Sequence, residues 1–133
     1  DVFTICHKAH MEHTLKDIAY WKIGINNMHI DGSLIWSSIR KSERESIGMV
    51  DDEDSDFVSY MGYTVGINVS VLFIETNEGY TKISWRAMPG YNVSEVATSL
   101  GGGGHKAASG ATIKKPIDEV IPMVLSKTKE MLF

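Results

Sequence analysis

The chain of 133 residues is long enough for one packed domain and too short for two of typical size. Its 43% of hydrophobic and 23% of charged residues are typical of a globular protein, and no apolar run approaches the roughly 20 residues needed to cross a bilayer. The net charge of -4 argues against a binding surface for long duplex nucleic acid, which needs clustered Lys and Arg. A small anion held by a few focused donors remains compatible with this charge.

The N-terminus begins with Asp1 rather than Met and carries no basic region followed by an apolar stretch, so we expect the chain to be part of a larger protein. The single cysteine, Cys6, cannot form an internal disulfide and fits a reducing compartment. We therefore predict a cytoplasmic protein that does not enter a membrane.

The first third of the chain predicts one helix and one strand. Apolar residues at mixed helical spacing predict a helix over residues 11–28, through Leu15, Ile18, Ala19 and Ile23, although Gly24 weakens its end. Asp31-Gly32 is typical of a turn, and residues 33–40 are rich in the branched and aromatic side chains of strands.

An acidic run follows, with Asp51, Asp52, Glu53, Asp54 and Asp56. Clustered carboxylates suit hard metal ions. They are more typical of the positive N-terminal end of a helix, which we predict over residues 55–61. We therefore predict no metal site in this run.

The middle of the chain predicts a β-hairpin. Residues 66–74 are almost wholly apolar, as expected for a central strand, and Asn77-Glu78-Gly79 supplies a turn. Residues 80–87 then alternate, with Lys82, Ser84 and Arg86 on the polar face. Arg86 closes that polar face.

The last third predicts two helices and a strand. Asn92-Val93-Ser94-Glu95 has the spacing of a capping box, and apolar positions 93, 96, 97 and 100 predict a short helix that ends at Gly101. A strand over residues 108–114 and a helix over residues 116–132 follow, with Pro122 costing at most one early hydrogen bond. The order α-β-α-β-β-α-β-α predicts an α/β (α+β) fold, a mixed β-sheet of about four to five strands covered by helices.

Four consecutive glycines, Gly101 to Gly104, form the segment with the clearest chemistry. Each is entropically costly to order, and a glycine run between a capped helix and a strand lets several backbone N–H groups turn toward one anion. His105 adds a hydrogen-bond donor and, when protonated, a positive charge. The alternative is a helix end with a flexible loop, for which one glycine suffices.

Two familiar glycine motifs do not fit this segment. Gly102, Gly104 and Ala107 match the dinucleotide-binding fingerprint in spacing only, because that motif follows a strand and opens a helix. A P-loop ends in Gly-Lys-Ser/Thr, where this chain has His105-Lys106-Ala107.

Three segments together resemble a known family: Lys82-Ile83-Ser84-Trp85-Arg86, Val93-Ser94-Glu95-Val96-Ala97, and Gly-Gly-Gly-Gly-His-Lys-Ala-Ala-Ser-Gly-Ala-Thr at positions 101–112. The pattern resembles the DHHA1 domain, the C-terminal half of DHH-family phosphoesterases. Within that family it is most similar to the short oligoribonucleotide hydrolases, which include enzymes that also remove the 3′-phosphate of adenosine 3′,5′-bisphosphate. The resemblance is strongest over residues 80–113 and is collinear from Asp31 onward.

The resemblance implies a substrate-binding role for six residues. In that family the DHHA1 domain positions the substrate and its Gly-Gly-Gly-His loop contacts a phosphate, which assigns this contact to Gly102, Gly103, Gly104 and His105. Arg86 is implied as a phosphate or base contact, with Ser84 on the same face as a further candidate. Where the family usually has a serine after that arginine, this chain has Ala87.

The resemblance also implies a catalytic half elsewhere. That half binds two manganese ions through Asp and His residues, including an Asp-His-His triplet that this sequence does not contain. We therefore predict no catalytic residue, metal site or cofactor in this chain, and expect manganese in a missing N-terminal DHH domain. His7, His10 and His13 with Glu12 are an alternative metal site, but on a helix they cannot all share one face.

We predict that residues 1–30 form a linker or leading helix from the missing domain and that residues 31–133 form the DHHA1 substrate-binding domain. The implied function is that of a manganese-dependent phosphodiesterase or exonuclease acting on short oligonucleotides or adenosine 3′,5′-bisphosphate. The same loop is compatible with a cyclic dinucleotide phosphodiesterase. Related domains of alanyl-tRNA synthetases leave a non-catalytic RNA-binding module as a third function, against which the acidic balance argues. The sequence leaves the oligomeric state open.

Overall fold

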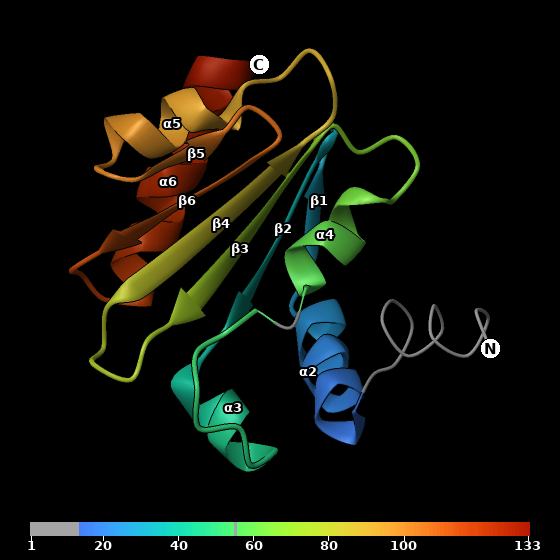
Figure 1. Cartoon of the computed structure of the whole chain (residues 1–133), viewed down its shortest axis with the longest axis vertical. Helices are drawn as coiled ribbons and strands as arrows, with labels where there is room; N and C mark the ends of the chain where they lie inside the picture. The colour runs from blue at the N-terminus through green and yellow to red at the C-terminus, as the bar shows by residue number, and fades with distance from the viewer. Residues whose placement is uncertain (1–13, 55) are drawn as a thin grey trace, which may run out of the picture.

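The computed structural model describes residues 14–54 and 56–133, which form an α+β fold on one six-stranded sheet (Figure 1). The strand order is β1-β2-β3-β4-β6-β5; β2 and β3 are parallel, and the other neighbouring pairs of this sheet are antiparallel. The strands are β1 (His29–Asp31), β2 (Leu34–Ile39), β3 (Val69–Glu75), β4 (Thr81–Ala87), β5 (Gly103–His105) and β6 (Ala108–Ile113). The helices are α2 (Leu15–Asn26), α3 (Lys41–Ser46), α4 (Phe57–Gly62), α5 (Val93–Ser99) and α6 (Ile117–Leu132).

The predicted fold class is confirmed, and the elements predicted from the sequence occur in the predicted order. Three short elements are additional: strands β1 and β5, and helix α3. The two strands raise the sheet from the expected four or five strands to six. Among the described residues, no helix combines the length and apolar character that spanning a membrane requires.

The β3–β4 hairpin forms the centre of the sheet, as its apolar pattern predicts. Every residue of β3 except Glu75 is buried, and the turn places Gly79 at φ 84°, a conformation that favours glycine. On β4, Ile83 and Trp85 face one core while Lys82, Ser84 and Arg86 face the other side of the sheet. The buried Trp85 donates from Nε1 to Thr128 Oγ1 at 3.1 Å, which satisfies its polar atom inside the core.

Helices cover the two faces of the sheet unequally. One face packs against α5 and α6 through a continuous cluster that includes Val96, Val120 and Val124. The opposite face packs against α2 and α4 through Tyr20, Phe57 and other apolar residues, and α4 contacts β2, β3 and β4. Figure 1 shows α5 and α6 grouped behind the β4–β6–β5 side and α2 and α4 over the β1–β3 side. The β6–β5 end of the second face therefore has no helix of the described part packed on it.

Helix α2 does not bury all of the apolar residues whose spacing predicts it. Leu15 is 86% exposed and Ile18 is 56% exposed, whereas the buried residues are Tyr20 and Gly24. The helix starts at Leu15 because Thr14 forms a reciprocal capping box with Asp17. The predicted residues before Thr14 lie outside the described part.

The close packing of Gly24 against α4 explains which side of α2 faces inward. A Cβ at position 24 would lie 2.4 Å from Cε2 of Phe57, so the absence of a side chain lets α2 approach α4 closely. The glycine that lowers the helix propensity is thus the contact point of the helix packing. Pro122 falls in the second turn of α6, which begins at Ile117, so its missing N–H removes one backbone hydrogen bond, the one to the carbonyl of Asp118.

We predict that Gly24→Ala lowers the free energy of unfolding by about 1–3 kcal/mol, because an added methyl group overpacks against the Phe57 ring. Helix propensity alone predicts the opposite, a gain of roughly 1 kcal/mol. Urea unfolding distinguishes the two signs, and Phe57→Leu combined with Gly24→Ala should recover part of the loss. A stabilised Gly24→Ala variant contradicts the close α2–α4 contact.

Candidate functional site

Helix α5 ends in a Schellman motif that fixes the start of the glycine run. Gly101 has φ 86°, and the N–H groups of Gly101 and Gly102 donate to the carbonyl oxygens of Thr98 (3.1 Å) and Ala97 (2.8 Å). Gly101 is therefore the C-terminal cap, as predicted. At the other end of α5, Asn92 accepts from the backbone N–H of Ser94 at 3.1 Å, a simple cap instead of the predicted reciprocal box.

The residues after Gly101 form an edge strand rather than a loop. Gly103, Gly104 and His105 pair with Gly110, Ser109 and Ala108 of β6. The turn that follows is held at two points, since Lys106 O accepts from Val93 N at 3.0 Å and Ala107 O accepts from Ala87 N at 2.9 Å. Ser109 Oγ also donates to His105 O at 2.7 Å. An edge strand leaves part of its backbone N–H and C=O groups unpaired and available to a ligand.

The four positions of the glycine run differ in whether the fold requires a glycine there. A Cβ on Gly102 would lie 2.1 Å from Gly110 O, and one on Gly104 would lie 2.6 Å from Ala108 O at a φ of 142°. The fold therefore requires glycine at both positions. At Gly103, by contrast, no heavy atom lies within 4 Å of an added Cβ, and the backbone has no positive φ. Nothing in the described chain requires Gly103 to be a glycine.

The sheet register brings four of the six predicted residues, Ser84, Arg86, Gly103 and His105, to one face, whereas Gly104 pairs with Ser109, the partner of Trp85, and belongs to the opposite face. Arg86 of β4 pairs with Ala108 of β6, which pairs with His105 of β5. Ser84 pairs with Gly110, which pairs with Gly103. Directly paired residues share a face, so two parallel rows run across the sheet, and Arg86 and His105 stand two strands or about 10 Å apart. We call this surface the open face; Gly102 precedes it and lies against β6.

Arg86 is held in place from two directions. Its Nη1 donates to the carbonyl oxygen of Trp85 at 2.9 Å, and its Nε donates to Ser59 Oγ of α4 at 3.3 Å. Gly62 passes close to Arg86, since an added Cβ there would lie 3.8 Å from Arg86 Cβ. Within the described residues, Nη2 has no hydrogen-bond partner, which leaves a fixed guanidinium with a free donor.

The open face is positively charged in an acidic chain. His105 and Gly103 are exposed, Arg86 and Lys82 are partly buried, and Ser84 is recessed at 8% exposure. Strands β4, β5 and β6 contain no Asp or Glu, although the whole chain has 17 acidic residues. The small residues Ala108 and Gly110 form a low floor between the side chains of β4 and those of β5. This arrangement focuses positive potential on one surface.

A cleft of about 320 Å³ borders the open face where α4 meets the sheet. It shares Arg86 and Ala108 with the open face. The other lining residues are Ser59, Gly62, Tyr63, Asn68, Ala87, Met88 and Ala107. Sequence reasoning does not find Tyr63, Asn68 or Met88, because they come from two separate connections, α4–β3 and β4–α5, and form no local motif.

The described residues include no group of three or more His, Cys, Asp or Glu side chains able to hold a metal ion. They therefore do not fit a two-metal centre. The alternative site at His7, His10 and His13 lies outside the described part of the chain. The acidic run directly precedes α4, whose N-cap is Asp56 at φ 61°. The helix begins at Phe57, two residues later than predicted, so no acidic residue lies in its first turn.

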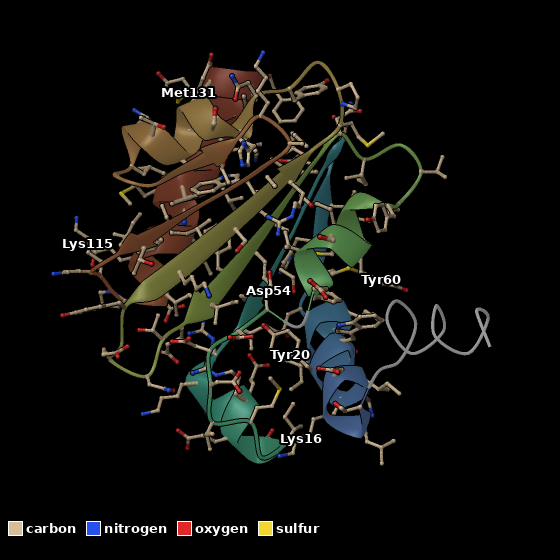
Figure 2. All side chains as sticks on the ribbon, in the orientation of Figure 1. Lys16, Tyr20, Asp54, Tyr60, Lys115 and Met131 are labelled. Atoms are coloured by element: carbon tan, nitrogen blue, oxygen red, sulfur yellow. The ribbon has the colours of Figure 1, made fainter. Side chains whose placement is uncertain are left out.

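The acidic run lies near a buried tyrosine. Figure 2 labels Tyr20 of α2 and Asp54, which lie close together below the sheet. Burial is the main cause that raises the pKa of Tyr20, and the negative charge of Asp54 raises it further. The Tyr20 hydroxyl is fully buried and, among the described residues, has no hydrogen-bond partner. This region is part of the core and stands apart from the open face.

Fold and site together define an α+β domain with a mixed sheet, helices on both faces and a glycine-rich edge hairpin beside an arginine-bearing strand. A family model described as the DHHA1 domain matches residues 44–132. The chain belongs to the DHHA1 domain family.

Known proteins extend this likeness. The chain is 36% identical over 105 residues to the bifunctional oligoribonuclease and PAP phosphatase NrnA of Thermus thermophilus, covering 78% of this chain and 31% of that protein. It is 31% identical over 121 residues to the NrnA protein of Mycoplasma genitalium, covering 89% of this chain and 37% of that protein. The chain thus spans about a third of the length of these curated relatives. In fold it is similar to an exopolyphosphatase-related protein from Bacteroides fragilis, with a TM-score of 0.87, 19% identity, and coverage of 98% of this chain and 39% of that one.

The unequal roles of the glycines give a stability test. We predict that Gly102→Ala and Gly104→Ala each lower the free energy of unfolding by about 2 kcal/mol or more, because the added methyl group meets backbone atoms. Gly103→Ala, the matched control, should change it by no more than about 0.5 kcal/mol. Thermal and urea unfolding of the three variants measure this order. Equal losses at all three positions contradict the close contacts described for β5 and β6.

Proposed function

We propose that the open face binds a phosphate group of a short oligonucleotide or nucleotide, and that this chain is the substrate-binding domain of a nucleotide phosphoesterase. The observation that carries the proposal is Gly103. It is an exposed glycine that the fold does not require, and it lies in a row with Ser84 on the face shared by Arg86 and His105. The absence of a side chain there leaves room for a ligand to reach the edge-strand backbone.

The chemistry of the face suits a phosphate. Arg86 offers a fixed guanidinium whose planar fork matches phosphate oxygens, and His105 offers a second donor across the floor of Ala108 and Gly110. Ser84 lies in the neighbouring row, is more deeply buried than Arg86 and His105, and contributes a hydroxyl. Unpaired N–H groups of β5 add neutral donors. A phosphate seated over Ala108 lies between these groups.

The activities in the names of the two relatives support a nucleotide substrate, since both relatives are named as oligoribonucleases that are also PAP phosphatases. We propose the same substrate classes for the whole protein. We assign metal binding, with manganese as the expected ion, and bond cleavage to a separate N-terminal DHH domain joined through the segment before residue 31. This chain then positions the substrate, and no bond-breaking step is assigned to its residues.

We predict that Arg86→Ala and His105→Ala each weaken binding of adenosine 3′,5′-bisphosphate by roughly ten- to a hundredfold, the effect of losing a charged hydrogen bond. Isothermal titration with the 133-residue chain measures the affinity, and the thermal midpoint of each variant is recorded in parallel. The matched control is Arg40→Ala, since Arg40 follows β2 at the other end of the sheet and pairs with Asp118. If both variants bind like the unaltered chain, the open face is not the phosphate site.

We predict that Gly103→Val weakens the same binding by at least tenfold while leaving the thermal midpoint unchanged or raised. The branched side chain occupies the open space above β5 and blocks the backbone from a phosphate, yet valine itself favours strands. Gly103→Ala should give an intermediate loss. Normal affinity in Gly103→Val shows that no ligand group approaches β5 at this point.

A further inference from the structure

The cleft beside Arg86 continues the open face toward α4. Both surfaces share Arg86 and Ala108, so a ligand whose phosphate contacts Arg86 has its next chemical group at the mouth of the cleft. The cleft holds about 320 Å³. Ligand sites in proteins span about 300–1,000 Å³, and this one is at the small end, suited to one nucleoside rather than to a longer chain.

The rim of the cleft carries large apolar groups that are free to contact a ligand. Tyr63 is 84% exposed and Met88 is 48% exposed. Tyr60, one turn earlier on α4, stacks on Trp21 at a ring distance of 5.0 Å, whereas Tyr63 has no ring partner among the described residues. An aromatic face and a polarizable thioether are groups against which a flat nucleobase packs well.

Asn68 gives the cleft a polar group in a defined orientation. Its backbone N–H donates to Ser33 O at 2.7 Å, and its carbonyl oxygen accepts from Met88 N at 2.9 Å. Its Nδ2 donates to Tyr91 Oη at 3.2 Å. The side-chain oxygen of Asn68 has no partner among the described residues, so it is the group left to accept a hydrogen bond from a ligand in the cleft.

Resting on the proposed function, we infer that this cleft is a nucleoside subsite: Tyr63 stacks on the base of the nucleotide whose phosphate Arg86 binds, and Asn68 Oδ1 accepts from its exocyclic amino group. The subsite therefore prefers adenosine to inosine, in which a carbonyl oxygen replaces that amino group. With inosine, the Asn68 Oδ1 and the carbonyl oxygen of the base are both acceptors, so neither receives a hydrogen bond from the other, and this lost bond is the source of the preference.

Three probes separate the base contact from the phosphate contact: adenosine 3′,5′-bisphosphate, inosine 3′,5′-bisphosphate and ribose 5-phosphate, which has no base. Affinities of the 133-residue chain are measured by NMR titration up to millimolar concentrations. Tyr63→Ala should weaken adenosine 3′,5′-bisphosphate binding roughly five- to a hundredfold and leave ribose 5-phosphate binding unchanged. Tyr63→Phe should behave like the unaltered chain, as should Tyr80→Ala, a control at a partly exposed tyrosine before the opposite end of β4.

Asn68 is tested by selectivity rather than by affinity alone. The unaltered chain should bind adenosine 3′,5′-bisphosphate more tightly than the inosine compound by about tenfold, and Asn68→Ala should reduce this ratio to near one. Thermal midpoints are recorded because the substitution also removes the bond to Tyr91. A ratio unchanged by Asn68→Ala, or absent from the unaltered chain, overturns the assignment of Asn68.

The outcomes distinguish this inference from the proposed function. If Tyr63→Ala binds all three probes normally while Arg86→Ala weakens all three, the phosphate site stands and the nucleoside subsite is wrong. If Tyr63→Ala weakens ribose 5-phosphate as strongly as the nucleotides, Tyr63 supports the phosphate site and does not stack on a base. If the unaltered chain binds none of the probes, or Arg86→Ala binds all of them normally, both proposals fail.

Discussion

Gly102 approaches the carbonyl oxygen of Gly110 so closely that no side chain fits between them, since a Cβ would lie 2.1 Å from that oxygen. The open face depends on this contact. The left-handed turn at Gly101 directs the chain from α5 back toward the sheet, and the contact at Gly102 lays it against β6. Gly103 to His105 can then pair in register, which places His105 in the same row as Arg86. A side chain at position 102 would lift β5 from the sheet and separate His105 from Arg86.

The unequal helix cover gives the face its exposure and its electrostatics. Helices α5 and α6 cover one side of the sheet, including β6, while α4 covers the other side only as far as β4. Arg86 lies at this boundary: Ser59 of α4 fixes its Nε, and the sheet beyond it is free. Acidic residues are absent from β4, β5 and β6, so the positive groups there are not neutralised by neighbours on the same strands. A net charge of -4 therefore coexists with a local cationic surface.

Periodicity predicts the long elements well because their own side chains determine what they bury. The alternation on β4 predicts which side Arg86 occupies, and the apolar run of β3 predicts its central place. The three-residue strands β1 and β5 carry no such signal, since pairing partners far along the chain define them. The buried face of α2 does not follow from its apolar spacing for a related reason: its closest contact is made by Gly24 against Phe57, and hydrophobicity cannot indicate a contact made by a missing side chain.

The same limit applies to the site and explains what its residues contribute. The glycine run is visible in the sequence, yet only the contacts show that Gly102 and Gly104 are needed by the fold while Gly103 is not. The cleft residues Tyr63, Asn68 and Met88 meet only after folding. The proposed phosphate donors lie on paired strands, so the positions of their backbones are fixed before any ligand arrives and little ordering entropy remains to oppose binding. The exposed side chains of Tyr63 and Met88 stay adjustable. In the proposed function, affinity for a phosphate is thus a property of the rigid sheet, and discrimination between bases falls to the adjustable rim and to the fixed amide of Asn68.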